Sequence, residues 1–101
     1  MTPAIEIPSD RIAEFCARHG IRRLSLFGSV LRKDFRSDSD VDFLVEFQPG
    51  IAIGFFGLAR LERELSTLLG GRKVDLRTPQ ELSRYFRSSV VNEAYVIHGP
   101  G

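Results

Sequence analysis

An aspartate inside an apolar strand is the feature of this sequence that most restricts the fold. Residues 41–47 read Val-Asp-Phe-Leu-Val-Glu-Phe, with large apolar side chains at every second position from Val41 to Phe47. This pattern predicts a central strand of a sheet. An unpaired carboxylate is costly in such a place. The position of Asp42 therefore favours a binding role over an incidental one.

A second aspartate precedes Asp42 by two residues. Side chains two apart on a strand point to the same face, so Asp40 and Asp42 can aim at one point. Carboxylate oxygens suit Mg²⁺, which is usually held by one or two carboxylates together with substrate phosphates. The alternative is that both aspartates cap a turn, because Ser-Asp-Ser-Asp is also a loop pattern. The cost of placing Asp42 in an apolar strand argues against that alternative.

A Gly-Ser pair supplies a candidate phosphate site. Ten residues separate Ser29 from Asp40. Gly28 has no Cβ and lets the backbone approach a phosphate closely. If a helix starts at Ser29 or Val30, its free N–H groups face the same anion. Arg32 would lie one turn into this helix and could reach a triphosphate with its planar donor fork, although a solvated arginine fits equally well.

A third carboxylate, Asp75, interrupts the short apolar stretch Val74–Leu76. Like Asp42, it is a carboxylate within a predicted apolar strand. The competing interpretation is a salt bridge to a basic neighbour, which would be Arg72, Lys73 or Arg77.

Hydrophobic periodicity and turn residues predict alternating helices and strands. The predicted helices are 9–19 with Ser9 as N-cap, 30–34, 55–69, and 79–91 behind a capping box at 78–81; the predicted strands are 21–27, 41–47, 74–76 and, at an edge, 95–97. This order predicts an α/β (α+β) fold with a small mixed sheet flanked by helices. We expect one domain over residues 1–101, with its core at about 9–97.

Composition excludes several classes of protein. The net charge is +1, so no broad basic surface for direct nucleic-acid binding is expected. No apolar run reaches membrane length. The single cysteine, Cys16, fits a reducing compartment, and we expect a cytoplasmic protein. Neither Cys16 nor the histidines, His19 and His98, show the spacing of a metal site or a catalytic triad; His98 is expected in a frayed tail.

Three motifs occur in a fixed order, namely Leu26-Phe27-Gly28-Ser29, Ser39-Asp40-Val41-Asp42 and Val74-Asp75-Leu76. Together they resemble the signature of the polymerase-β-like nucleotidyltransferases. The surrounding residues resemble the smallest branch of that superfamily, the minimal nucleotidyltransferases. The resemblance runs from about Ile12 to about Ala94.

The resemblance implies the polymerase-β-like fold and a role for each motif residue. Three acidic residues would hold one or two Mg²⁺ ions and carry catalysis: Asp40, Asp42 and Asp75. Three further residues would bind the nucleotide, with ATP as substrate: Gly28, Ser29 and Arg32. By the same resemblance, Asp75 can accept the proton of the attacking hydroxyl group. The implied reaction is Mg²⁺-dependent transfer of AMP with release of pyrophosphate.

Many members of this branch are antitoxins encoded beside HEPN-domain toxins. The resemblance therefore implies a HEPN toxin as protein partner, modified with AMP on a tyrosine and thereby silenced. The predicted core uses almost the whole chain, so we expect an acceptor that brings its own binding surface. Two alternatives stand beside this one: an antitoxin that masks its toxin by contact without catalysis, and a nucleotidyltransferase acting on a small-molecule acceptor. The second would need a pocket completed by a homo-oligomer.

Overall fold

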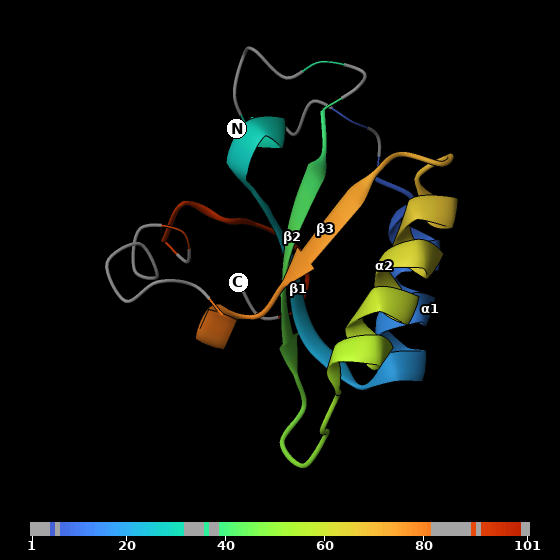
Figure 1. Ribbon diagram of the computed structural model, residues 1–101, viewed down its shortest axis with the longest axis vertical. Coiled ribbons are helices and arrows are strands. Elements are labelled where there is room, and N and C mark those ends of the chain that lie inside the picture. Colours follow the sequence, from blue (N-terminus) through green and yellow to red (C-terminus); the bar gives the residue numbers. More distant parts are fainter. Residues whose placement is uncertain are drawn as a thin grey trace.

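The computed structural model shows a four-stranded mixed sheet with helices packed against one face (Figure 1). It describes residues 5, 7–31, 36, 39–81, 90 and 92–99. The elements in chain order are α1 (Ser9–His19), β1 (Ile21–Phe27), the 3₁₀ turn η1 (Gly28–Leu31), β2 (Val41–Phe47), α2 (Phe55–Leu68), β3 (Val74–Arg77), the 3₁₀ turn η2 (Pro79–Glu81) and β4 (Tyr95–His98). The strand order is β3-β2-β1-β4. The predicted α/β (α+β) fold class is confirmed.

Strand β2 lies inside the sheet, antiparallel to β1 and parallel to β3. Val41, Phe43 and Val45 on one face of β2 are fully buried, and Leu44 on the other face is nearly so. The second face is buried at Leu44, whereas Asp42 and Glu46 on the same face are half-buried. The parallel pair needs a crossover connection, which α2 supplies between β2 and β3.

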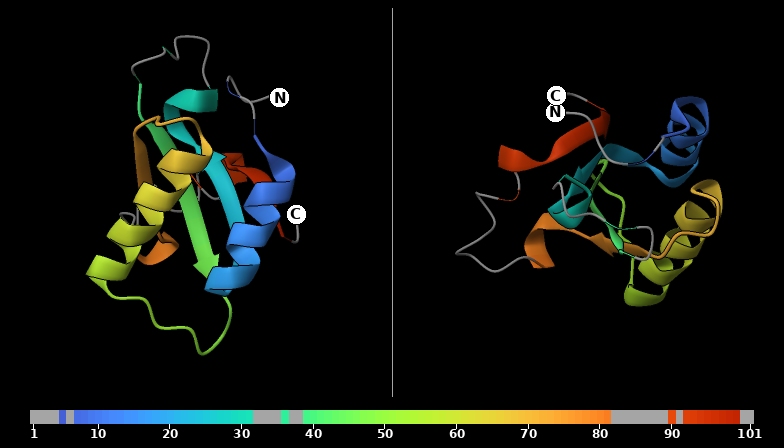
Figure 2. Two further views of the ribbon diagram at one scale, coloured as in Figure 1. Left: turned by 90° about the vertical axis from the view of Figure 1, so that its right-hand side faces the viewer. Right: turned by 90° about the horizontal axis from the view of Figure 1, so that it is seen from above.

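Helices α1 and α2 lie side by side over the same face of the sheet (Figure 2). Helix α1 buries Ile12, Phe15 and Cys16, as its spacing predicted, and α2 buries Leu61 and Leu65. These side chains recur at helical spacing and form one core with the sheet. Burial raises the pKa of the Cys16 thiol to about 11, so this cysteine is a core residue rather than a reactive one.

The ends of α1 differ in part from the prediction. Ser9 was expected to cap the helix, but it is the first helical residue and Pro8 occupies the N-cap position. The carbonyl of Pro8 accepts the first helical hydrogen bond, from the N–H of Ile12 at 2.9 Å. The prediction for the other end is confirmed: Gly20 has a φ of +66°, and its N–H bonds to the carbonyl of Cys16.

Two predicted helices lie mainly outside the described residues. Of the helix predicted at 30–34, the structure describes Val30 and Leu31, which belong to η1. Of the helix predicted at 79–91, it describes the first turn as η2 and, beyond that turn, Val90. Within the described part of the chain, no helix is long and apolar enough to cross a bilayer.

Strand β4 pairs antiparallel with the free side of β1 and forms one edge of the sheet. His98 lies in this strand opposite Leu24. The prediction of a frayed tail at His98 was therefore wrong, because its backbone is paired within the sheet.

A polar contact joins the two helices. Nε2 of His19 at the end of α1 lies 2.6 Å from Oε2 of Glu64 in α2, and Nη1 of Arg18 lies 2.9 Å from Oε1 of Glu64. Partial burial alone would raise the pKa of Glu64, but hydrogen bonds and charge from His19 and Arg18 outweigh it and lower the pKa below its ordinary value of 4.5. The contact therefore favours the folded state while Glu64 is ionised.

We predict that Glu64→Gln lowers the free energy of unfolding by about 1 kcal/mol or less near neutral pH. The pKa of Glu64 is lower in the folded than in the unfolded chain. Its contribution is therefore complete above pH ~4.5 and is lost as the pH falls through the folded-state value. Denaturant titrations between pH 3 and 7 would measure this. Glu14→Gln, at an exposed position of α1, is the control. A cost that does not change with pH would contradict the prediction.

Candidate functional site

The parallel pairing of β2 with β3 sets two of the predicted acidic residues beside each other. In this register Asp42 is the partner of Asp75. Asp40 immediately precedes β2, at the point where the N–H of Val41 donates to the carbonyl of Lys73 at 2.9 Å. All three aspartates are half-buried. The structure thus brings the three predicted carboxylates to the N-terminal end of the parallel pair.

The predicted Gly-Ser turn lies on the other side of Asp42. Phe27, the last residue of β1, is the antiparallel partner of Asp42, and Gly28 follows it. Gly28 has a φ of +76°, a conformation that favours glycine. A Cβ at this position would collide with Oδ2 of Asp42. The backbone conformation therefore favours glycine here, and a Cβ would also force the Asp42 carboxylate to shift, which the sequence did not reveal.

The remainder of the predicted phosphate site is described in part. The backbone of Ser29 lies in η1, whereas its side chain and the whole of Arg32 are outside the described residues. Turn η1 packs against β1 and β2, and Val30 anchors it in the core with 1% of its surface exposed. The turn is therefore fixed next to the strand that carries Asp42.

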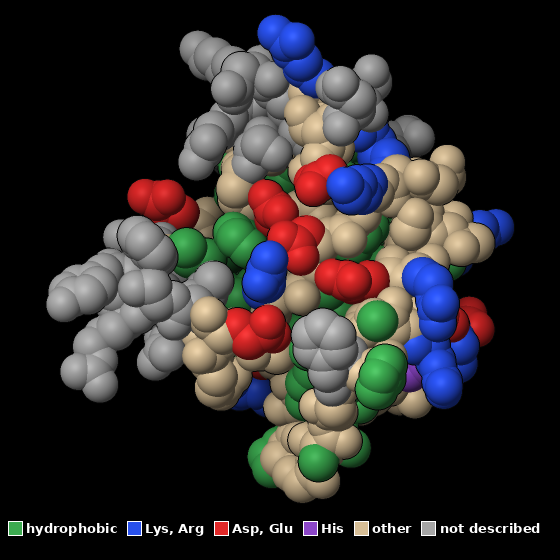
Figure 3. All heavy atoms as spheres, in the orientation of Figure 1, with side chains coloured by type: hydrophobic (Ala, Val, Ile, Leu, Met, Phe, Trp, Pro, Cys, Tyr) green, Lys and Arg blue, Asp and Glu red, His purple; other side chains and the backbone are tan. Residues whose placement is uncertain are grey.

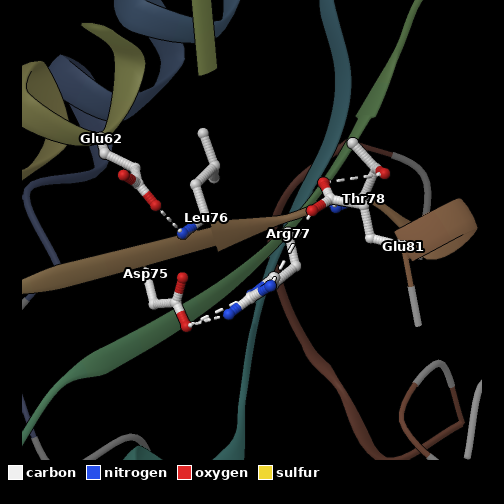
Figure 4. Close-up of polar contacts among 6 residues, drawn as sticks. All are labelled: Glu62, Asp75, Leu76, Arg77, Thr78 and Glu81. Carbon is white, nitrogen blue, oxygen red and sulfur yellow. Dashed lines mark hydrogen bonds and ion pairs between the residues drawn. The ribbon is translucent and has the colours of Figure 1, made fainter. Parts of the chain in front are cut away.

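Asp75 forms an ion pair with Arg77, two residues further along β3. Nε and Nη2 of Arg77 lie 3.3 and 3.2 Å from Oδ2 of Asp75 (Figure 4). The hydrogen bond and the charge of Asp75 raise the pKa of Arg77. The salt bridge that the sequence offered as a competing interpretation of Asp75 is thus present. Across the described part of the chain, no group of three His, Cys, Asp or Glu side chains converges closely enough to hold a metal ion.

Glu62 is a site neighbour that the sequence analysis missed. Its carboxylate accepts a hydrogen bond at 2.7 Å from the N–H of Leu76, and so ties the edge strand β3 to α2 (Figure 4). A side chain in this position also covers a backbone donor that would otherwise be exposed at the edge. The signal was available, because Glu62 has helical spacing with Leu58 and Leu65 on the buried side of α2.

The surface around these residues is charged and shallowly hollowed. Acidic and basic side chains lie side by side over the middle of the face shown in Figure 3. A hollow of about 200 Å³ is lined by Asp75 and Arg77 together with Glu62 and Glu81. A larger hollow of about 660 Å³ lies toward the other end of β2, beside the loop 48–53. Of the three predicted acidic residues, Asp75 lines the smaller hollow.

The donor set at this end of the sheet fits a hard cation. The predicted ligands offer only carboxylate oxygens, the donors that Mg²⁺ prefers. Because Gly28 has no Cβ, Oδ2 of Asp42 can lie close to the backbone at position 28. The donor chemistry thus suits Mg²⁺, while in this structure the three described carboxylates do not converge on one point and Asp75 is engaged by Arg77.

The sequence matches a known family over most of its length. The profile of the family described as polymerase beta, nucleotidyltransferase matches residues 10–100. The protein adenylyltransferase MntA of Thermococcus cleftensis is 36% identical over 84 residues, which cover 83% of this chain and 82% of that protein.

Solved structures share the architecture. One, assigned as a minimal nucleotidyltransferase, is 41% identical, with a TM-score of 0.68 over 85% of each chain. A toxin–antitoxin structure with AMP-PNP is 20% identical, with a TM-score of 0.74 over 93% of this chain and 75% of that chain. A complex of tri-AMPylated Shewanella oneidensis HEPN toxin with MNT antitoxin gives 20% identity and a TM-score of 0.60, over 91% of this chain and 70% of that chain. The last two comparisons show a common fold.

We predict that Gly28→Ala destabilises the protein more than Gly70→Ala. Both glycines have nearly the same positive φ, +76° and +75°, so both substitutions carry the same backbone strain of about 1–3 kcal/mol. Only the new Cβ at position 28 would also meet Asp42, whereas the space at Gly70 is open. Thermal and denaturant unfolding of the two variants would measure the difference. Equal losses of stability would show that the approach of Gly28 to Asp42 has no energetic weight.

Proposed function

Because this chain belongs to the polymerase beta nucleotidyltransferase family, we propose that it transfers AMP from ATP to a tyrosine of a cognate HEPN toxin. The chain would then be the antitoxin of a toxin–antitoxin pair. One relative is named protein adenylyltransferase, and this name supports AMP as the transferred group. A solved complex contains an AMPylated HEPN toxin bound to a protein of the same fold, and this supports a HEPN toxin as the acceptor. A cytoplasmic location is part of the proposal and agrees with a single, buried cysteine.

The register of Asp42 with Asp75 is the observation that carries this proposal. Two carboxylates on neighbouring strands repel each other unless a cation lies near them. A sheet with a purely structural role gains nothing from that arrangement. Phosphoryl chemistry, by contrast, needs a cation bound beside the substrate phosphates.

Mg²⁺ is the cofactor that we propose for this site, with one or two ions. Its ligands would be Asp40, Asp42 and Asp75, which present oxygen donors from two adjacent strands. When bound, Mg²⁺ would offset the charge of the triphosphate and of the transition state. Gly28, Ser29 and Arg32 would hold the phosphates, and the fixed position of η1 next to β2 supports this role for the turn.

The proposed reaction makes one phosphorus–oxygen bond and breaks another. The tyrosine oxygen of the toxin attacks the α-phosphorus of ATP, and the bond from that phosphorus to the bridging oxygen breaks, so pyrophosphate leaves. Asp75 would accept the proton of the tyrosine hydroxyl. The remaining contribution of the chain is to orient the two reactants and to bind negative charge.

Silencing of the toxin follows from the chemistry of the product. AMP adds a bulky group that carries negative charge. The family resemblance implies that the toxin is a ribonuclease. Attached near the active site of such an enzyme, AMP would repel the phosphate backbone of RNA and block access to the site. A covalent mark would outlast the encounter between the two proteins, which distinguishes this mode from masking by contact.

We predict that the toxin gains the mass of one or more AMP groups when it is co-expressed with this protein. The gain should disappear with Asp42→Asn, because asparagine keeps the shape of the side chain but not the charge that a cation requires. Asp10→Asn, at an exposed position in the first turn of α1, should leave the gain intact. Intact-mass spectrometry of the toxin and melting curves of both variants would measure this.

The competing functions give different results in the same experiment. An antitoxin that works by contact would neutralise the toxin without any change of mass, and Asp42→Asn would neutralise it equally well. A nucleotidyltransferase with a small-molecule acceptor would release pyrophosphate in a cell extract but leave the toxin unmodified. Either result would contradict the proposed acceptor.

We also predict that Mg²⁺ and ATP together raise the melting temperature by more than the sum of their separate effects. Ligands that bind only the folded state stabilise it. If a cation bridges the carboxylates and the triphosphate, each ligand increases the affinity for the other. Differential scanning fluorimetry with Mg²⁺, ATP and both would test this, with Asp42→Asn as the control that should lose the excess. Strictly additive shifts in the unmodified protein would contradict a bridging cation.

A further inference from the structure

Arg77 lies between two carboxylates of which only one is a proposed metal ligand. On one side its Nη2 lies 3.2 Å from Oδ2 of Asp75. On the other side its Nη1 lies 3.9 Å from Oε2 of Glu81 (Figure 4). The closer contact is thus with the carboxylate that the proposed function assigns to metal binding.

The chain itself produces this arrangement. Asp75 and Arg77 are two apart on β3 and therefore share a face of the strand. Glu81 is four residues beyond Arg77, in η2. The exposed fractions of the three side chains are 36% for Asp75, 47% for Arg77 and 39% for Glu81. Because all three are partly in solvent, the guanidinium can change partner without disturbing the core.

Glu81 is positioned to be a second ion-pair partner for Arg77. Its Oε1 receives hydrogen bonds from the N–H and the hydroxyl of Thr78, both at 3.2 Å. Its other oxygen, Oε2, is the one that faces Arg77. The contact with Thr78 thus fixes the carboxylate through one oxygen and directs the other toward the arginine.

A divalent cation on Asp75 conflicts with the present position of Arg77. Magnesium–oxygen distances are about 2.1 Å, so a cation bound to this carboxylate would lie within roughly 6 Å of the guanidinium. Two positive charges at that separation repel each other. The ion pair and the metal site therefore compete for the same side chain.

We infer that Arg77 is a movable counter-ion, which leaves Asp75 for Glu81 when a divalent cation binds. Arg77 then lowers the affinity of the site for the cation, and Glu81 raises it by accepting the displaced guanidinium. Arg77 is a positioning residue in this scheme, since it acts through the orientation of Asp75. The inference rests on the proposed function only in assigning a cation to Asp75.

Binding of Mn²⁺ to the purified full-length chain tests the inference without any measurement of transfer. Free Mn²⁺ is quantified by electron paramagnetic resonance at fixed ionic strength. Arg77→Gln should tighten binding about 1.5- to 5-fold, the range that corresponds to the strength of a partly exposed ion pair. Arg77→Lys keeps the charge and should stay close to the unmodified protein.

Glu81→Gln should change the affinity in the opposite direction. The glutamine keeps an oxygen for Thr78 but no longer attracts Arg77, so Mn²⁺ binding should weaken by a similar factor. In the double variant Arg77→Gln, Glu81→Gln the second substitution should have no further effect, because its partner is gone. Arg63→Gln removes an equal charge from an exposed position on α2 and measures the general effect of net charge.

Distinct outcomes separate the failure of this inference from the failure of the proposed function. If Mn²⁺ binds and Asp42→Asn abolishes binding, the metal site stands, and the Arg77 and Glu81 variants decide the inference alone. Binding that is weakened or unchanged by Arg77→Gln would overturn it. So would a loss caused by Glu81→Gln that persists in the double variant, because Glu81 would then act through its charge alone. No Mn²⁺ binding by the unmodified chain would overturn the metal site and this inference together.

Discussion

The parallel pairing of β2 with β3 is the interaction on which the other features of the structure depend. It exists because α2 crosses over the sheet and returns the chain beside β2, so that both strands run in one direction. The register sets Asp42 against Asp75. A shift of one residue would turn the side chains of β3 to the opposite faces and bury the carboxylate in the core. Core packing and the geometry of the site are therefore fixed by the same pairing.

The acidic end of the sheet is accommodated by several local contacts. Gly28 omits the Cβ that would collide with Asp42, and Arg77 forms an ion pair with Asp75. The carboxylate of Glu62, in α2, accepts a hydrogen bond from the N–H of Leu76 in β3. Each contact supports the strands that carry the aspartates. Arg77 differs from Gly28 and Glu62, because its partner Asp75 is also a proposed metal ligand.

Several contacts could not be predicted because they join residues distant in sequence. The pair between His19 and Glu64 spans 45 positions and depends on how α1 packs beside α2. The approach of Gly28 to Asp42 depends on the register of β1 with β2. The Asp75–Arg77 pair joins near neighbours instead, and it was one of three salt bridges that the sequence allowed. Spacing along the chain could not choose between Lys73 and Arg77, since both lie two residues from Asp75.

The sequence by itself determined the four strands, the helices α1 and α2, and their order, because hydrophobic periodicity and turn residues act locally. The bounds of β1 and β2, the apolar face of α1 and the glycine ending at Gly20 are as predicted. It also supplied three aspartates and a Gly-Ser turn in a recognisable spacing. Only the tertiary structure decided that Asp42 stands opposite Asp75, and that Asp75 is paired with Arg77. The physical reason is that pairing between strands and charge contacts are set by packing in three dimensions, which local pattern does not encode.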